Sequence, residues 1–234
     1  MAEAPALLLT CEHAGNRIPA EYRVLFRGAA RLLAGHRGYD FGARVLAHAL
    51  ARRLHAPLIA AVYSRLLVDL NRSPGHAGLF STRTRGLSPS EKQRLLARYY
   101  RPHRERVEHW ITARVSAGVP VVHVAVHSFT PVLDGVTRRT DIGLLYDPAR
   151  EREAALCTRW CADLRAADTL VVRRNYPYRG VSDGLTRYLR ARFPALHYAG
   201  IELELNQALL RRDTTTHRRL PALLAATLRG ILAG

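Results

Sequence analysis

Short apolar segments alternate along the whole chain with longer segments whose apolar residues recur at helical spacing. The short segments are almost unbroken runs of Val, Leu and Ile, which is typical of strands covered by helices on both faces. The longer segments have the period of amphipathic helices. Strands are predicted at Ala6–Cys11, Pro57–Tyr63, Val119–Val126, Ile142–Tyr146, Thr169–Val172 and Ile201–Leu205. Helices are predicted at Asp40–Leu54, Ser88–Ser116, Pro148–Ala166, Asp183–Arg192 and Thr215–Leu232.

This alternation predicts an α/β fold, a three-layer sandwich around a mostly parallel or mixed sheet. The length of 234 residues fits a single domain, residues 1–234. One helix start is marked in detail, because Ser88, Pro89 and Glu91 form the pattern of a capping box. We expect Ser88 to cap backbone donors and Glu91 to reach back to the cap residue.

The formal net charge is +17, and Lys92 is the only lysine among the 36 basic residues. Nucleic-acid-binding proteins often carry runs of Lys and Arg, whereas these arginines are scattered along every segment. A general bias toward arginine explains the same pattern, so the charge does not by itself predict a nucleic-acid partner.

Three cysteines are too few and odd in number for a disulfide framework. Cys157 and Cys161 are spaced to share one helix face, where we expect them to be small apolar core residues. No apolar run approaches the roughly 20 residues that cross a bilayer, and the first residues lack the cationic start of a signal peptide. We therefore expect a cytoplasmic protein without a membrane partner.

Polar residues of the types that catalyse reactions or bind ligands lie at the ends of the predicted strands. In open α/β sheets, ligands bind outside the carboxyl ends of the strands, so these residues are expected to converge on one edge. They are Glu12 and His13 after the first strand, Arg65, Asp69, Asn71 and Arg72 in the second region, His127 after the central strand, and Glu202 and Glu204 on the last strand. Four strand ends of this kind predict an active site.

Two histidines and a carboxylate are the usual protein ligands of a catalytic zinc ion. His13 and His127 would supply the nitrogens. Asp40 opens the next predicted helix, where it serves equally well as a ligand or as a helix cap. A glutamate on the last strand would be the general base, but Glu202 and Glu204 share one strand face, so alternation does not choose between them.

Arg65 and Arg72 flank a strand that is predicted to end at the same edge. A guanidinium binds a carboxylate through two parallel hydrogen bonds and stays charged at any working pH. Asp69 would orient one guanidinium, and Asn71 would add an amide donor. This pattern predicts a clamp for an acidic substrate, with a purely structural Arg–Asp pair as the alternative.

Several short motifs follow one another in a specific order along the chain. They are Cys11-Glu12-His13-Ala14-Gly15-Asn16 with Ile18-Pro19, Gly38-Tyr39-Asp40-Phe41-Gly42-Ala43, Ser64-Arg65, Asp69-Leu70-Asn71-Arg72, His127-Ser128-Phe129, Asp141-Ile142-Gly143, Asn175-Tyr176-Pro177-Tyr178 and Glu202-Leu203-Glu204-Leu205-Asn206-Gln207. The order and spacing of these motifs resemble those of the N-formylglutamate amidohydrolase family. The family is similar to zinc exopeptidases of the carboxypeptidase and aspartoacylase type. The resemblance therefore implies their phosphorylase/hydrolase-like α/β fold and hydrolysis of an N-formyl or other N-acyl amide of glutamate.

The resemblance also implies roles for single residues. His13 and His127 match the histidine ligands, Glu204 matches the base, and Arg65, Asn71 and Arg72 match the carboxylate clamp. The exopeptidases use His-x-x-Glu, but the third position after His13 is Asn16. Cell-wall amidases of a related fold take this ligand from the start of the following helix, which implies Asp40, with Glu12 as the alternative. Asn175 and Tyr178 are implied contacts of the substrate or its oxyanion.

Together these observations predict a zinc-dependent, or other divalent-metal-dependent, amidohydrolase for a small acidic N-acyl amino acid. N-formylglutamate is the first candidate substrate. The alternatives are a related peptide or cell-wall amidase, a basic nucleic-acid-binding protein, and a cysteine hydrolase built on Cys11 and His13. The two-residue gap in that last pair seldom lets a base reach the thiol.

Overall fold

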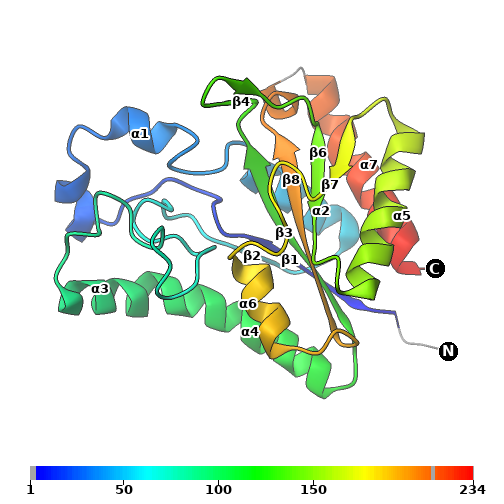
Figure 1. Cartoon of the computed structure of the whole chain (residues 1–234), viewed down its shortest axis with the longest axis horizontal. Helices are drawn as coiled ribbons and strands as arrows, with labels where there is room; N and C mark the ends of the chain where they lie inside the picture. Colours follow the sequence, from blue (N-terminus) through cyan, green and yellow to red (C-terminus); the bar gives the residue numbers. More distant parts are fainter. Residues whose placement is uncertain (1–3, 212–213, 234) are drawn as a thin grey trace.

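Six strands form one central sheet in the computed structural model, which describes residues 4–211 and 214–233 (Figure 1). The strand order is β2-β1-β3-β8-β6-β7. Strands β2, β1, β3 and β8 are parallel to one another, whereas β6 is antiparallel to β8 and parallel to β7. The strands are β1 (Ala6–Cys11), β2 (Leu58–Ala60), β3 (Val121–Phe129), β6 (Ile142–Leu145), β7 (Val172–Arg174) and β8 (Tyr198–Asn206). The predicted α/β fold with a mostly parallel sheet is confirmed.

Helices cover both faces of this sheet. One apolar cluster joins β1, β3 and β8 to α2 (Ala43–Leu54), α5 (Glu151–Ala167) and α7 (Thr214–Ala233). A second cluster packs α4 (Arg101–Ser116) and α6 (Leu185–Arg192) against the opposite face. The side chains of Leu9 and Leu8, adjacent on β1, point to these two clusters and are both fully buried. This burial on both faces is why the strands are apolar without alternation.

The long predicted helix at residues 88–116 is present but interrupted. It consists of α3 (Pro89–Leu95), a π-helical turn at Leu96–Tyr100, and α4. The capping box is confirmed, because Ser88 Oγ accepts a hydrogen bond from Glu91 N at 3.3 Å and Ser88 N donates to Glu91 Oε2 at 3.1 Å.

Two predicted boundaries near the polar edge differ from the structure. Strand β3 continues to Phe129, so His127 lies within the strand and not after it. Helix α2 begins at Ala43 and not at Asp40, because Gly42 adopts the left-handed conformation with φ 77° and turns the chain into the helix.

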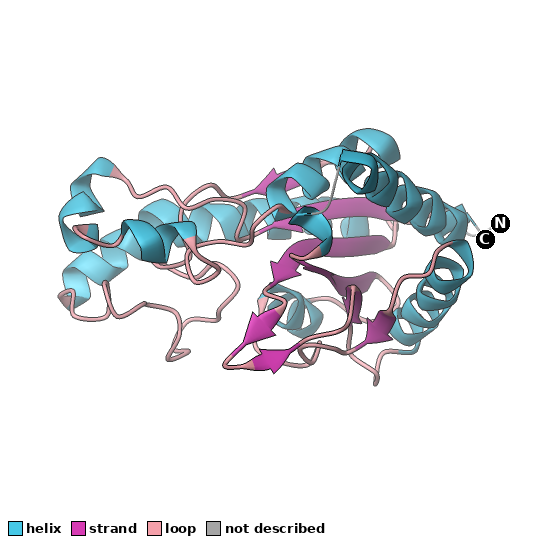
Figure 2. Cartoon of the chain, turned by 90° about the horizontal axis from the view of Figure 1, so that it is seen from above, coloured by secondary structure: helices cyan, strands magenta, loops and turns pink. Residues whose placement is uncertain are grey.

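A lateral extension was not predicted from the sequence. Residues 18–34 and 61–100, which we call the lobe, have their own apolar cluster around Leu67, Leu79 and Leu95. Figure 2 shows the lobe extending to one side of the layered part of the molecule. The lobe contains η1 (Ala20–Phe26) and α1 (Ala30–Ala34) as well as α3. Residues 64–73 form turns, so the strand predicted between Arg65 and Arg72 is wrong.

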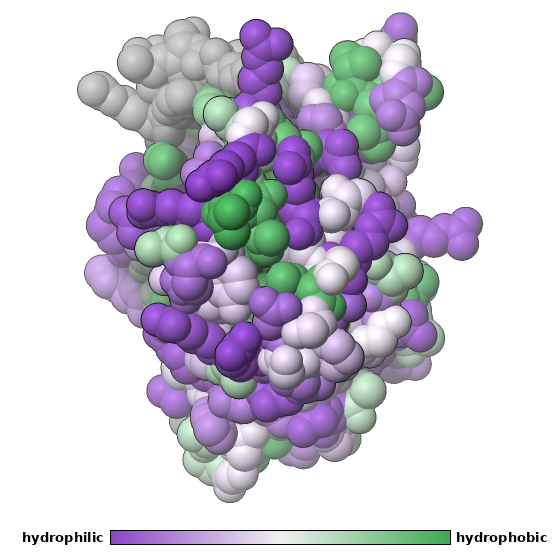
Figure 3. Space-filling view, turned by 90° about the vertical axis from the view of Figure 1, so that its left-hand side faces the viewer, coloured by the Kyte–Doolittle hydropathy of each residue, from purple (hydrophilic) through white to green (hydrophobic). Residues whose placement is uncertain are grey.

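Smaller elements complete the fold. A hairpin of β4 (Val132–Leu133) and β5 (Val136–Thr137) follows β3, and η3 (Leu209–Arg211) follows β8. Cys157 and Cys161 lie buried on α5 as predicted. No helix within the described ranges is long and apolar enough to cross a membrane. Hydrophilic side chains cover most of the face that carries the lobe, around a few apolar groups (Figure 3).

Candidate active site

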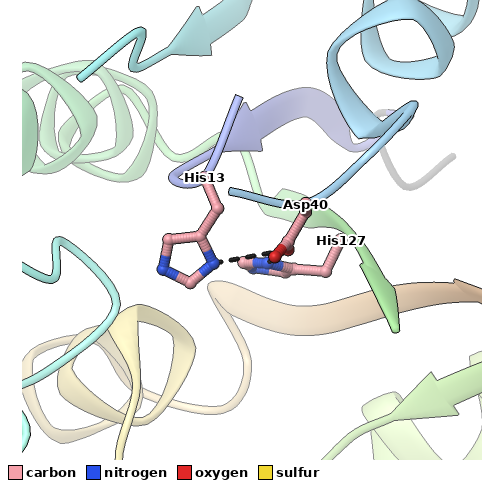
Figure 4. A group of neighbouring side chains, drawn as sticks. All are labelled: His13, Asp40 and His127. Carbon is pink, nitrogen blue, oxygen red and sulfur yellow. Dashed lines mark hydrogen bonds and ion pairs between the residues drawn. The ribbon is translucent and has the colours of Figure 1, made fainter. Parts of the chain in front are cut away.

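Three side chains meet at the carboxyl edge of the sheet: His13 after β1, Asp40 before α2, and His127 on β3 (Figure 4). One nitrogen or oxygen from each residue lies within 4.8 Å of the others. Asp40 Oδ2 is 3.3 Å from His13 Nδ1 and 2.9 Å from His127 Nδ1. All three residues are buried. The structure thus brings together His13, His127 and Asp40, the three residues singled out from the sequence as candidate metal ligands.

The backbone explains this convergence. Strands β1 and β3 are parallel neighbours, with Thr10 beside Ala125, so residues just beyond each position reach the same edge. Asp40 N donates a hydrogen bond to His13 O at 3.0 Å, which fixes the two loops against each other. Asp40 turns its carboxylate toward the histidines and makes no side-chain cap on α2.

A second carboxylate lies on the far nitrogen of each histidine. Asp69 Oδ1 is 2.7 Å from His13 Nε2, and Glu12 Oε2 is 3.0 Å from His127 Nε2. His103 on α4 lies on the other side of Glu12, with 3.4 Å between His103 Nε2 and Glu12 Oε1. The sequence analysis did not find His103, because its partner is 91 residues away and its place on a helix carries no motif.

These contacts set the ionisation of the cluster. Burial alone raises the pKa of Asp40, but the neighbouring His13 and His127 outweigh it and hold that pKa well below its ordinary range. Burial alone lowers the pKa of His127, but Asp40 and Glu12 on its two nitrogens raise that pKa well above its ordinary value. The carboxylates of the cluster are therefore stabilised in their charged form by the neighbouring imidazoles.

Arg65 is the cation closest to this group. Its Nε and Nη2 donate to Asp69 Oδ2 at 3.1 and 2.7 Å, and its Nη1 is 3.6 Å from Asp40 Oδ1. The predicted pairing of Asp69 with a guanidinium is thus present. Burial alone raises the pKa of Asp69, but Arg65 and His13 outweigh it and hold that pKa well below its ordinary range.

Glu204 lies beside His127 in the register of β3 and β8. Its side chain is buried, and Oε2 has no hydrogen-bond partner among the described residues. Burial, as the largest cause, raises the pKa of Glu204 to about 8. Glu202 lies two residues earlier, where its Oε1 accepts a hydrogen bond from Thr186 Oγ1 at 2.6 Å. The two glutamates share a strand face, but only Glu204 is level with a histidine of the cluster.

A pocket of about 270 Å³ opens next to the cluster. Its lining includes Asp40 and Arg65, Ser128 and Phe129 at the end of β3, and Tyr178 from the loop after β7. The lining also includes His36, Arg37, Leu66, Thr130 and Leu133. The pocket thus brings a guanidinium, a phenol and an apolar wall to the histidine–carboxylate cluster.

Other residues singled out from the sequence support the surrounding backbone. Asn71 Oδ1 accepts a hydrogen bond from Leu185 N at 2.6 Å, and Arg72 Nη1 donates to Asp183 O at 2.6 Å, so both residues hold the start of α6. Neither residue lines the pocket that contains Arg65. Asn175 has φ 50°, and its Oδ1 accepts from two backbone amides, Tyr146 N and Gly180 N.

Cys11 and Asn16, which the sequence analysis also discussed, are not part of the histidine–carboxylate cluster. Cys11 is fully buried in the core, and burial raises the pKa of its thiol well above the ordinary value. It is a poor nucleophile for this reason. Asn16, at the position where exopeptidases have glutamate, donates to Leu33 O at 3.1 Å and is not among the three clustered residues.

The donor set fits a divalent metal ion. Two imidazole nitrogens and one carboxylate oxygen converge, as in catalytic zinc sites that leave a position for water. The far nitrogens of both histidines meet carboxylates, which is the arrangement that orients imidazole ligands. The unpartnered oxygen of Glu204 is a further sign of a site built to receive something.

Comparisons with known proteins identify the family of the chain. The family model described as N-formylglutamate amidohydrolase matches residues 5–211. The structure is similar to that of a gene product of Agrobacterium tumefaciens, with 30% identity, a TM-score of 0.84, and 98% and 91% of the two chains covered. It is also similar to N-formylglutamate amidohydrolase from Ralstonia eutropha JMP134, with 22% identity, a TM-score of 0.69, and 99% and 96% covered. A comparison with curated proteins gives no significant match. The chain belongs to the N-formylglutamate amidohydrolase family and is a hydrolase that acts on amide bonds.

Proposed function

We propose that this chain hydrolyses the N-acyl amide of a small acidic amino acid, with N-formylglutamate as the first candidate, and that it uses a divalent metal ion, zinc first. The observation that carries the proposal is the convergence of His13, Asp40 and His127 beside the unpartnered carboxyl of Glu204. The family match supports the N-acyl amino acid as the substrate class.

The metal would be held by His13 Nδ1, His127 Nδ1 and Asp40 Oδ2. When bound, a zinc ion acidifies a water molecule and polarises the substrate carbonyl. We assign the carboxylate ligand to Asp40 and not to Glu12, because Asp40 faces the same nitrogen of both rings whereas Glu12 lies on the opposite nitrogen of His127. Glu12 and Asp69 then fix the orientation and the tautomer of the two histidines.

Glu204 is the proposed general base. Its Oε2 would take a proton from the attacking water and deliver it to the nitrogen of the departing amino acid. Burial suits this role, because it makes the carboxylate a stronger base than an exposed glutamate. Glu202 is instead held by Thr186, and we infer that it supports β8 and α6 and does not transfer the proton.

Arg65 is the proposed contact for the substrate's α-carboxylate. This carboxylate lies two bonds from the scissile amide nitrogen, so its partner must be close to the metal ligands. Arg65 meets that condition, with its Nη1 at 3.6 Å from Asp40 Oδ1. Tyr178 lines the same pocket and has a hydroxyl that accepts from Arg138 Nη1 at 3.1 Å, which leaves its own proton available to a substrate oxygen.

Release of formate from N-formylglutamate tests the proposal. The wild type should catalyse it, and Glu204→Gln should lower kcat by at least about a hundredfold, the usual contribution of a general base. Zinc binding should be unchanged in that variant, because Glu204 is not among the ligands. Absence of hydrolysis in the metal-loaded wild type, or full activity in Glu204→Gln, would contradict the proposed mechanism.

A further inference from the structure

The pocket beside the cluster has a second guanidinium, that of Arg37, which the sequence motifs did not single out. Arg37 lies between α1 and Asp40, and it is exposed at the mouth of the pocket. No hydrogen bond or ion pair joins its side chain to another residue in ranges 4–211 and 214–233. Arg37 therefore differs from Arg65, whose charge is already opposed by Asp69 and Asp40.

The backbone that carries Arg37 is held firmly in place. The next residue, Gly38, accepts a hydrogen bond at its carbonyl from Ser64 Oγ at 2.8 Å. A Cβ at Gly38 would come within 2.2 Å of Leu33 O, so only glycine allows this close approach. Gly38 N also donates to Gly35 O at 2.9 Å. Arg37 is thus presented at the mouth of the pocket by a fixed turn.

The charges of the pocket lining favour the binding of an anion beside Arg37. Asp40 is the only acidic side chain that lines it among the described residues, and its oxygens face the histidines and Arg65. Three exposed residues of the lining are Arg37, which carries a cation, His36, which carries an imidazole, and Tyr178, whose hydroxyl is a further donor. An unopposed guanidinium beside donor groups is a binding place for a carboxylate.

We propose that Arg37 binds the side-chain carboxylate of the acidic substrate and so selects it over a neutral one. This inference rests on the proposed function for the position of the substrate. Arg65 lies next to the metal ligands, where the α-carboxylate must be, whereas Arg37 is farther out at the solvent-exposed mouth. The side-chain carboxylate of glutamate is separated from the α-carbon by two methylene groups, so in this proposal it extends away from the metal ligands toward Arg37.

The proposal departs from the clamp implied by the family resemblance. Arg72 is bound to Asp183 O at 2.6 Å, and its own carbonyl accepts from Tyr100 Oη and Arg104 Nη1. Arg72 is therefore engaged in holding the lobe to α4 and α6. Arg37 is free of such contacts within the part of the chain that the structure describes, and it lines the pocket.

The test compares N-formylglutamate with N-formylglutamine, which has the same shape without the side-chain charge. Arg37→Ala should reduce the preference for the acidic substrate, measured as the ratio of kcat/KM values, by about tenfold, as expected for one charge-assisted hydrogen bond at a solvent-exposed site. Arg31→Ala is the matched control, since Arg31 is an exposed arginine on α1 that does not line the pocket, and it should leave the ratio unchanged.

Binding of N-formylglutamate to the metal-loaded protein, measured by calorimetry, separates the two proposals. If the wild type binds the compound more tightly than Arg37→Ala does but does not hydrolyse it, the proposed function is wrong and the role of Arg37 stands. If the wild type hydrolyses it and Arg37→Ala keeps the preference, or Arg72→Ala alone removes it, the role of Arg37 is overturned. If the wild type neither binds nor hydrolyses it, both proposals are wrong.

Discussion

Replacement of Asp69 by asparagine gives the sharpest test of the outer carboxylates. Asp69 receives four donors: His13 Nε2 and Asn71 N at Oδ1, and Arg65 Nε and Nη2 at Oδ2. An asparagine has one acceptor oxygen and one NH₂ group. In either orientation the NH₂ group would face donors, so half of these bonds must break.

The expected effect on the metal follows from this geometry. Orientation of a ligating imidazole by an outer carboxylate is worth about 10- to 100-fold in metal affinity, or about 1.4–2.7 kcal/mol. The bond of 2.7 Å to His13 Nε2 is short and buried, and in the variant it is either lost or made to a neutral amide oxygen in place of the carboxylate. We therefore expect Asp69→Asn to weaken zinc binding by this factor. The donors left without an acceptor should also lower the free energy of unfolding by about 1–3 kcal/mol.

The assay is a competition titration of zinc against a chelator, with circular dichroism to show that the variant is folded. Asp163→Asn is the matched control, because it is the same substitution at a position on α5, outside the site. It should leave the zinc affinity unchanged. Wild-type zinc affinity in folded Asp69→Asn would refute the positioning role of Asp69.

Two further predictions concern β3 and β8. His123 is buried between Thr10 and Tyr198, and burial lowers its pKa from 6.5 to about 4. Its neutral form thus stabilises the fold above pH 6.5, and this contribution, up to about 3 kcal/mol, is lost as the pH falls from 6.5 to 4. Denaturant titrations should show a shallower loss of stability over this range in His123→Gln, and an unchanged loss would contradict the assignment. Glu202→Gln should change kcat less than tenfold, because glutamine can still accept from Thr186; a loss as large as in Glu204→Gln would transfer the role of base to Glu202.

The sequence was sufficient for the layered part of the fold. Its strands are buried on both faces, so their apolar runs stand out, and β1 was predicted with its observed limits. The rule that ligands bind at the carboxyl ends of parallel strands also brought His13 and His127 to one place. Both predictions depend on local patterns that can be recognised in the sequence without knowledge of tertiary contacts.

The lobe and the turns at its base were not predictable in the same way. Residues 64–73 have an apolar run that suggests a strand, but Leu67, Val68 and Leu70 are buried in the lobe's own cluster and not in the sheet. The adjacency of Arg72 to Asp69 in sequence suggested one clamp, yet turns send Arg72 to α6 and leave Arg65 at the pocket. His103 reaches the site only through tertiary packing, and the exposure of Arg37 beside the pocket depends on the turn at Gly38.

Zinc binding in the wild type and in His127→Ala tests the central claim most directly, with formate release from N-formylglutamate followed in the same samples. We predict one tightly bound zinc ion per wild-type chain, loss of hydrolysis on chelation with recovery on adding zinc, and neither stable zinc nor activity in folded His127→Ala. Hydrolysis that persists in wild-type protein shown to be free of metal, or unimpaired zinc binding in His127→Ala, would contradict the account.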